Sequence, residues 1–357
     1  MAALDASVYG YLLSSFLMRI GLVSWDYAPP KGGLGRAMQS LKGALQELGH
    51  EVHVCVPKTL TGGPFLYSLI LFFTLPHWVR SKKIDTLVFP VGPGGIFLVQ
   101  KIRSVRTIAI SYHTYGQQAR DVPGESWKRV FIPFEKAALH TADRILCYSR
   151  DTQKFLHRSY GFSSDAIRYC TQLLPRELFE HAPVRKQQGL CVAVLRLDRR
   201  KGLDVLLRAW PLVQAEHTSA RLVIVGDGMM KASVDRFVSL YPQVSRVSRL
   251  SDRELRTLIS GAEIAFCPAY LEGFGLAAAE AMLLGTVLVA ADSDGLRSLV
   301  RHGILFPPGG ASALAHATSR LLADAALRTQ LSRAAADDMR SRFSRSNAKR
   351  DLSSALA

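Results

Sequence analysis

The stretch Glu272-Gly273-Phe274-Gly275-Leu276-Ala277-Ala278-Ala279-Glu280-Ala281-Met282 places two carboxylates on either side of a predicted helix start. Gly273 and Gly275 allow a sharp turn and a close approach to a ligand, and residues 276–284 are rich in Ala and Leu, which form helices well. The first free N–H groups of this helix and the positive end of its dipole would face an anion such as a diphosphate. Because carboxylates repel phosphate, the pair is better suited to accept hydrogen bonds from sugar hydroxyls.

The alternative is an ordinary pair of surface carboxylates that flank a buried helix. Two glutamates alone would favour that interpretation. With Gly-Phe-Gly between them, the stretch instead favours a ligand site, with Glu272 just outside the helix and Glu280 about one turn inside.

A second stretch, Val194-Leu195-Arg196-Leu197-Asp198-Arg199-Arg200-Lys201-Gly202, gathers basic residues between a strand and a helix. Arg196 ends an apolar strand predicted over residues 190–195, and Lys201 opens a helix that continues through 203–210. Two fixed cations in such a loop can neutralise a leaving diphosphate without a metal. The alternative is a solvated basic turn, to which we assign Arg199 and Arg200.

Length and patterning indicate the fold class. A chain of 357 residues exceeds one typical core and predicts two domains. Strands alternate with helices, as in residues 221–226 followed by 229–240, which is typical of α/β proteins with parallel, doubly wound sheets. The five cysteines have no paired spacing, so we expect no zinc site and no disulfide framework, and a reducing cytoplasm is the simplest compartment.

The N-terminal part predicts a strand over 18–24, a Gly-rich loop with Gly33, a helix ending near Leu48 and a strand over 51–56. Backbone N–H groups of such a loop can contact phosphate. Met38 stands where the third glycine of a dinucleotide fingerprint would be, so that fingerprint matches poorly. Farther on, His113 follows an apolar strand at the sheet edge where ligands of open α/β sheets bind. Alternatively, it forms a hydrogen bond within its loop.

These motifs, taken in order from about residue 18 to the C-terminus, resemble family 4 glycosyltransferases. The resemblance implies the GT-B fold, in which two Rossmann-like domains face each other across a donor-binding cleft. It also implies transfer of a sugar from a nucleotide diphosphate sugar to an acceptor hydroxyl with retention, in a metal-independent, hexosyltransferase-type enzyme without a cofactor. It implies catalytic roles for His113 and Glu272, and donor-binding roles for Gly33, Arg196, Lys201, Phe274, Gly275, Leu276 and Glu280.

By this resemblance we expect an N-terminal extension over residues 1–17, an acceptor-side domain over 18–180 and a nucleotide-sugar domain over 181–340. A helix over 341–357 would cross back to the first domain. Two loops depart from the family pattern: residues 168–175 replace an Asn-Gly-x-Asp element, and Asp294 to Ser298 replace a Gly-Gly…Glu loop, so that Ser298 brings no carboxylate. Donor-side motifs are kept while acceptor-side motifs drift, as either a change of acceptor or a partial decay of activity would produce.

The net charge of +16 fits nucleic acid, an anionic membrane surface or an anionic donor as the partner. Because no nucleic-acid module appears, we expect no nucleic-acid partner. Residues 65–75 are strongly apolar. An aromatic of the kind found at membrane interfaces, Trp78, and three cations, Arg80, Lys82 and Lys83, follow. This segment is too short to span a bilayer, and it is either a helix at the membrane interface or a buried helix. We therefore expect a cytoplasmic enzyme, peripheral on the inner face of the membrane, with a lipid-linked or cell-envelope glycan as acceptor.

Two other functions remain open at the level of sequence. A sugar-nucleotide epimerase with the GT-B fold would share the diphosphate site. A non-catalytic protein that binds a sugar nucleotide would fit the altered loop at Asp294 and Ser298.

Overall fold

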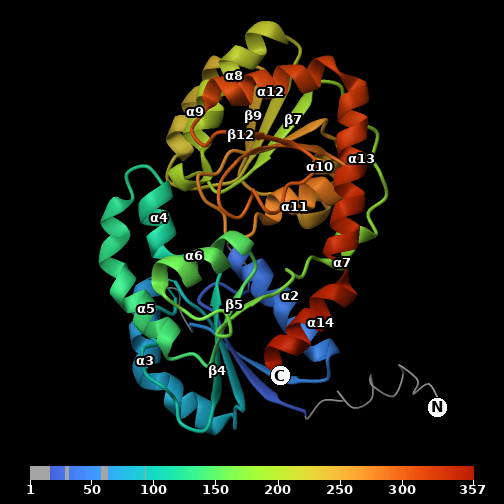
Figure 1. Ribbon diagram of the computed structural model, residues 1–357. Helices are drawn as coiled ribbons and strands as arrows, with labels where there is room; N and C mark the ends of the chain where they lie inside the picture. The colour runs from blue at the N-terminus through green and yellow to red at the C-terminus, as the bar shows by residue number, and fades with distance from the viewer. Residues whose placement is uncertain (1–16, 29–31, 58–62, 93) are drawn as a thin grey trace, which may run out of the picture. The chain divides into compact units, whose positions relative to one another are not determined.

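The computed structural model describes residues 17–28, 32–57, 63–92 and 94–357 (Figure 1). The chain forms two compact units. The first holds the chain up to Ile110, Phe134–Ile145 and the last two residues, and the second holds Ser111–Pro133 and Leu146–Ala355. The domain boundaries expected at 180 and 340 stay predictions, and residues 1–16 of the expected extension lie outside the described residues.

The described residues form two six-stranded sheets, the first with the strand order β2-β1-β3-β4-β5-β6. The predicted strands at 18–24 and 51–56 are confirmed as β1 (Arg19–Val23) and β2 (Glu51–Cys55), which pair in parallel. Strand β1 is apolar and almost entirely buried, as a central strand covered on both faces must be. The remaining strands are β3 (Thr86–Pro90), β4 (Arg106–Ser111), β5 (Arg144–Cys147) and β6 (Ile167–Tyr169).

Helix α2 (Gly33–Glu47) follows β1 and ends where expected. Leu48 is its C-cap, and Gly49 has a φ of +89°, a conformation that glycine adopts without strain. Its apolar face buries Met38, Leu41 and Leu45.

Helix α3 (Gly63–Ser81) covers the apolar segment noted in the sequence, and it is neither fully buried nor fully exposed. One face buries Leu71, Leu75 and Val79, whereas other apolar residues face solvent. The interpretation of Trp78 as an interfacial aromatic is wrong. A Cβ on Gly21 of β1 would lie 2.9 Å from the Trp78 ring, so this side chain packs on the sheet.

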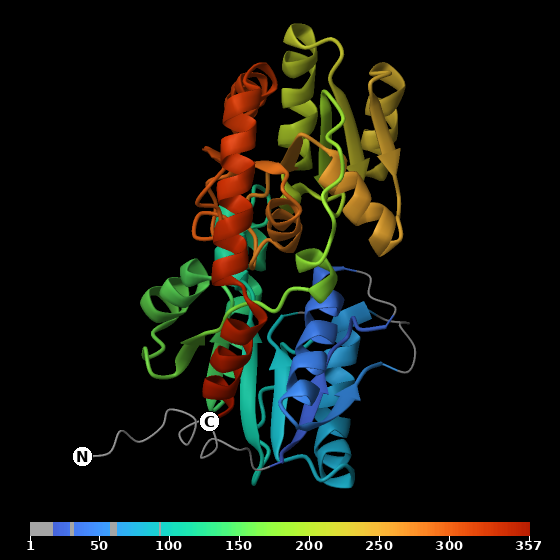
Figure 2. The same cartoon turned by 90° about the vertical axis from the view of Figure 1, so that its right-hand side faces the viewer.

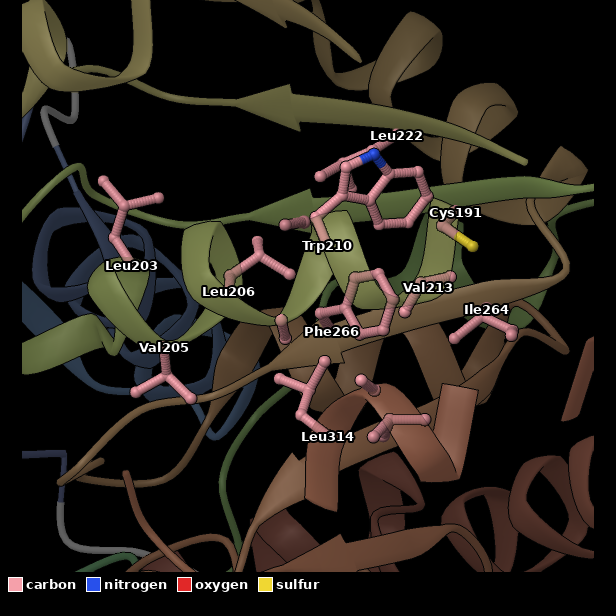
Figure 3. Packing of buried hydrophobic residues seen from close by; sticks show 14 of the residues in the cluster. Cys191, Leu203, Val205, Leu206, Trp210, Val213, Leu222, Ile264, Phe266 and Leu314 are labelled. Carbon is pink, nitrogen blue, oxygen red and sulfur yellow. The ribbon is translucent and has the colours of Figure 1, made fainter. Parts of the chain in front are cut away.

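The second sheet has the strand order β12-β11-β10-β7-β8-β9. Its core centres on Trp210, which is fully buried and meets Phe266 edge to face at 6.5 Å between ring centroids (Figure 3). Both rings lie among aliphatic residues such as Leu206, Leu222 and Leu314. The strands are β7 (Leu190–Val194), β8 (Arg221–Val225), β9 (Val244–Val247), β10 (Ile264–Cys267), β11 (Val287–Ala291) and β12 (Ile304–Phe306).

Helices connect the strands in both units, and in the second unit α12 packs on α8 and α13 packs on α11 (Figure 2). The helix expected to start at 341 starts at Arg345 instead, because α13 continues to Arg342. The remaining helices are α4 (Tyr115–Asp121), η1 (Ser126–Phe131), α5 (Ile132–His140), α6 (Arg150–Tyr160), α7 (Arg176–Phe179), η2 (Arg199–Lys201), α8 (Leu203–Glu216), α9 (Lys231–Leu240), α10 (Asp252–Gly261), α11 (Leu276–Leu283), α12 (Ala311–Ala323), α13 (Ala325–Arg342) and α14 (Arg345–Leu356).

Candidate active site

Helix α11 begins where the glycines predict it. Gly275 is its N-cap with a φ of +94°, and a Cβ there would lie 2.8 Å from a methyl of Leu296. A Cβ on Gly273 would lie 2.7 Å from the Cβ of Tyr112. Both positions therefore require glycine, and the contact at Gly273 brings the Glu272–Gly275 turn onto the residue next to His113.

Phe274 points away from this turn. Its side chain is 5% exposed, and its ring meets Phe343 edge to face at 5.2 Å between centroids. The ring thus anchors the turn in the core. Leu276, the first residue of α11, is half-buried.

The two glutamates are buried, at 9% exposure for Glu272 and 7% for Glu280, so the interpretation of a surface carboxylate pair is wrong. Oε1 of Glu272 lies 2.5 Å from Nζ of Lys201. The backbone N–H of Glu272 donates to the carbonyl of Asp294 at 3.1 Å. Gly295, with a φ of +87°, lets that loop approach, since a Cβ there would lie 2.2 Å from the Glu272 carbonyl oxygen.

Asp198 organises the basic loop. Its carboxylate accepts a hydrogen bond from the backbone N–H of Lys201 at 3.0 Å and another from Nε of Arg196. Burial alone would raise the pKa of Asp198, but the positive charges of Arg200 and Arg196 outweigh burial and lower the pKa. The loop is therefore held by a charged carboxylate, with Arg196 mostly exposed.

Two expectations about this loop are wrong. Lys201 does not open the helix but ends the short 3-10 turn η2, because Gly202 takes a φ of +67° and α8 starts at Leu203. A Cβ on Gly202 would lie 1.8 Å from the carbonyl oxygen of Pro268. Arg200 is not left to solvent either, since its guanidinium donates to the carbonyl of Leu271 at 3.0 Å.

His113 is partly buried, and its Nδ1 is buried with no hydrogen-bond partner among the described residues. The alternative of a loop hydrogen bond is thus not supported at this atom. Burial lowers the pKa of His113 well below its ordinary value, and the positive charges of Arg200, Lys201, Lys128 and Arg196 lower it further. The imidazole is therefore neutral near pH 7, in a strongly positive surrounding.

A hydrogen-bond network that the sequence analysis missed joins the His113 and Glu272 segments. Oε1 of Gln117 accepts a hydrogen bond from the backbone N–H of Thr114 at 3.0 Å. Nε2 of Gln117 donates a hydrogen bond to Oδ2 of Asp294 at 3.0 Å. Arg120 reaches the same oxygen at 2.5 Å. The Thr-x-x-Gln capping box at residues 114–117 was visible in the sequence, but its partner 177 positions away was not.

Gly33 is the first residue of α2 in the first unit, whereas the other predicted site residues lie in the second. Near Gly33, the backbone N–H of Gly35 donates to the buried carboxylate of Asp26 at 3.2 Å. One of the free N–H groups at this helix start is therefore already paired with an anion.

The chain resembles known proteins over most of its length. Residues 176–338 match the family model "Glycosyl transferases group 1", and residues 31–170 match "Glycosyltransferase Family 4". The chain is 30% identical to the glycogen synthase of Mycobacterium tuberculosis, over 91% of each chain. It is 24% identical to a GDP-mannose-dependent alpha-(1-6)-phosphatidylinositol dimannoside mannosyltransferase of that species, over 79% of this chain and 82% of the other. The structure of sucrose-phosphate synthase from Thermosynechococcus elongatus aligns with a TM-score of 0.81 at 22% identity, over 95% and 98% of the two chains.

The two parallel six-stranded sheets and the alignment with sucrose-phosphate synthase show the GT-B fold. The chain belongs to the group 1 glycosyltransferases.

The described residues contain neither a candidate metal site nor a membrane-spanning helix. No group of three or more His, Cys, Asp and Glu side chains is placed to hold a metal ion. No helix among the described residues is long and apolar enough to cross a membrane.

Proposed function

We propose that the protein transfers a hexose from a nucleotide diphosphate sugar to an acceptor hydroxyl with retention and without a metal ion. The observation that carries the proposal is the contact of the buried Glu272 with Lys201, beside a neutral His113 and the open start of α11. A cation, a hydrogen-bond acceptor and a helix N-terminus are the groups that a sugar diphosphate requires.

Lys201 and Arg196 would neutralise the diphosphate as charge develops on the leaving group. The first N–H groups of α11 at Leu276, after the Phe274–Gly275 turn, would bind the same oxygens, with Gly33 as a further backbone contact. Glu280 would accept hydrogen bonds from the ribose, and Glu272 from hydroxyls of the transferred sugar.

A neutral His113 suits a place beside the transferred sugar, because an imidazolium there would add a positive charge to a site that already holds four cations nearby. The imidazole can bind a sugar hydroxyl through its ring nitrogens. Retention at the anomeric carbon is supported by the family resemblance, not by a single side chain.

The chemistry of relatives supports the donor and acceptor classes. The name of the mannosyltransferase relative gives it as GDP-mannose-dependent and refers to a phosphatidylinositol dimannoside. We therefore place this enzyme in the cytoplasm, peripheral on the inner membrane face, with a lipid-linked or cell-envelope glycan as acceptor.

The decisive experiment combines a thermal-shift screen with product analysis. A nucleotide diphosphate hexose that binds the folded state should raise the melting temperature and so identify the donor. With that donor and an extract of envelope lipids and glycans, we expect a glycosylated product with the donor's anomeric configuration. An inverted product would contradict retention. Epimerised or free sugar alone would favour the epimerase alternative, and tight donor binding without turnover would favour the non-catalytic one.

A further inference from the structure

Helix α3 presents one row of large apolar side chains to solvent. Phe65, Leu66, Leu69, Ile70 and Phe73 are 36%, 45%, 46%, 50% and 71% exposed. Their spacing places them on one side of the helix, opposite the buried Leu71, Leu75 and Val79. Because the buried face already anchors α3 to its sheet, the exposed row is not needed for the fold.

Neighbouring elements extend this row. The backbone N–H of Phe97 donates to Ser68 at 2.9 Å, and the Gln100 amide donates to the Phe72 carbonyl, so residues 97–100 lie along α3. The ring of Phe97 meets that of Phe134 on α5 at 5.9 Å between centroids. Val99 and Phe134 are 38% and 46% exposed. The apolar face therefore consists of Phe65, Leu66, Leu69, Ile70, Phe73, Val99 and Phe134, all in the first unit.

Positive charge borders the apolar face. Arg80, Lys82 and Lys83 are exposed at the C-terminal end of α3. Between Glu51 and Asp85 the sequence contains no acidic residue. An apolar surface with a basic border is complementary to an anionic bilayer, since the side chains enter the interface while the cations meet the headgroups.

A second copy of the chain fits this surface less well. Two copies meeting face to face would bring their basic borders together, and like charges repel. A large exposed apolar patch otherwise marks an interaction site, because monomers in solution rarely keep one.

We propose that the apolar face is a docking site for an anionic phospholipid bilayer, with α3 lying in the interface and Arg80, Lys82 and Lys83 at the headgroups. The proposal deepens the proposed function, because it brings the enzyme to a lipid-linked acceptor. Lipid binding itself needs neither donor nor acceptor, so a failure here is distinguishable from a failure of that function.

The test uses the full chain and sedimentation with vesicles of phosphatidylcholine alone or mixed with phosphatidylglycerol. We expect the wild type to bind the anionic vesicles. The triple variant Leu69→Ser, Ile70→Ser, Phe73→Ser should bind them at least tenfold more weakly. The matched control Met229→Ser, Leu240→Ser removes two other exposed apolar residues and should bind like the wild type. Donor thermal shifts and circular dichroism should be unchanged in both variants, which shows that they are folded.

The charges are tested separately. The variant Arg80→Gln, Lys82→Gln, Lys83→Gln should lose about fivefold in anionic-vesicle binding per charge. The control Arg236→Gln, Arg253→Gln, Arg333→Gln removes three exposed charges of the second unit and should lose much less. The proposal is overturned if the wild type does not bind anionic vesicles, or if the apolar variant binds as the wild type does. The wild type could instead prove to be a dimer and the apolar variant a monomer, with equal lipid binding by both. That result would show that the face binds a second copy of the chain.

Discussion

Nζ of Lys201 lies 2.5 Å from Oε1 of Glu272, although 71 positions separate the two residues in the sequence. Both side chains are largely buried, at 19% and 11% exposure. In the proposed mechanism they bind different parts of the donor, Lys201 the diphosphate and Glu272 the sugar. In the structure they bind each other, so the donor, bound as proposed, would exchange this ion pair for two separate interactions.

The first prediction separates the two glutamates. Glu280→Gln should weaken binding of nucleoside diphosphate and of the donor alike, by about 1.5–3 kcal/mol, because it removes the charge from a hydrogen bond to the ribose. Glu272→Gln should bind nucleoside diphosphate at least as tightly as the wild type, because Lys201 loses a competing partner. It should lower kcat instead, since the sugar is held less well during reaction.

Calorimetric titration with nucleoside diphosphate and steady-state kinetics measure both effects. Glu216→Gln, an exposed change on α8, is the control and should alter neither. Wild-type behaviour of both Glu272→Gln and Glu280→Gln would remove the pair from the site.

The second prediction is that turnover is independent of divalent metal. Lys201 and Arg196 supply the positive charge that a metal would otherwise bring to the leaving diphosphate. Activity should therefore persist in excess EDTA after the enzyme is dialysed against chelator. Loss of activity in EDTA with recovery in Mg²⁺ or Mn²⁺ would show that the cation pair is not sufficient.

The third prediction concerns pH and stability. The unfolded chain protonates His113 near its ordinary pKa of about 6.5, whereas in the folded protein burial and neighbouring cations hold the pKa well below that value. Between these two pKa values the unfolded state binds more protons, so the free energy of unfolding falls as the pH is lowered below about 6.5. His113→Asn should remove this contribution.

Urea unfolding at pH 7.5 and 5.5 is the measurement. The stability of His113→Asn relative to the wild type should rise on going to pH 5.5, whereas the exposed control His77→Asn should not show this rise. A relative stability of His113→Asn that is the same at both pH values would mean that His113 protonates equally in the folded and unfolded states.

The fourth prediction tests Asp294 as a positioning residue. Asp294→Ala leaves Gln117, Arg120 and Arg297 without their shared acceptor, so the loop that holds the Glu272 backbone should lose its orientation. We expect a fall in kcat of about tenfold or more, equivalent to about 1.4 kcal/mol, with little change in the KM for the donor. Asp294→Asn keeps a carbonyl oxygen in place and should recover part of the loss.

Asp292→Ala is the matched control for Asp294→Ala. Its carboxylate also pairs with Arg297 but is 45% exposed, and exposed ion pairs contribute at most about 1 kcal/mol. An equal effect of the two alanine variants, or a loss that appears only in the melting temperature, would reduce Asp294 to a stabilising role.

Local features of this protein were well predicted from its sequence, and contacts over long sequence separations were not. The start of α11 followed from Gly275, and α2 ends near Leu48 as expected. Such features depend on a few neighbouring residues. The network of Gln117 with Asp294 depends on segments that only the folded chain brings together.

Errors at Arg200 and Trp78 have a related cause. Each side chain was assigned to solvent or to the membrane interface from its chemical type and its neighbours in sequence. In the structure Arg200 has a carbonyl as partner, and Trp78 meets a strand residue that has no side chain. Amphipathic side chains adopt whichever environment the surrounding elements offer, so their type alone does not decide the outcome.

The passage of Ser111–Pro133 into the second unit constrains how this enzyme can recombine with its relatives. A chimera with a single breakpoint near residue 180 would take Tyr112 from one parent and Gly273 from the other, although the two backbones leave no room for a Cβ between them. Exchange of the first unit between such enzymes therefore needs at least two breakpoints, or parents that already agree at residues 111–133. Residue 112 and the 272–275 turn should be inherited together.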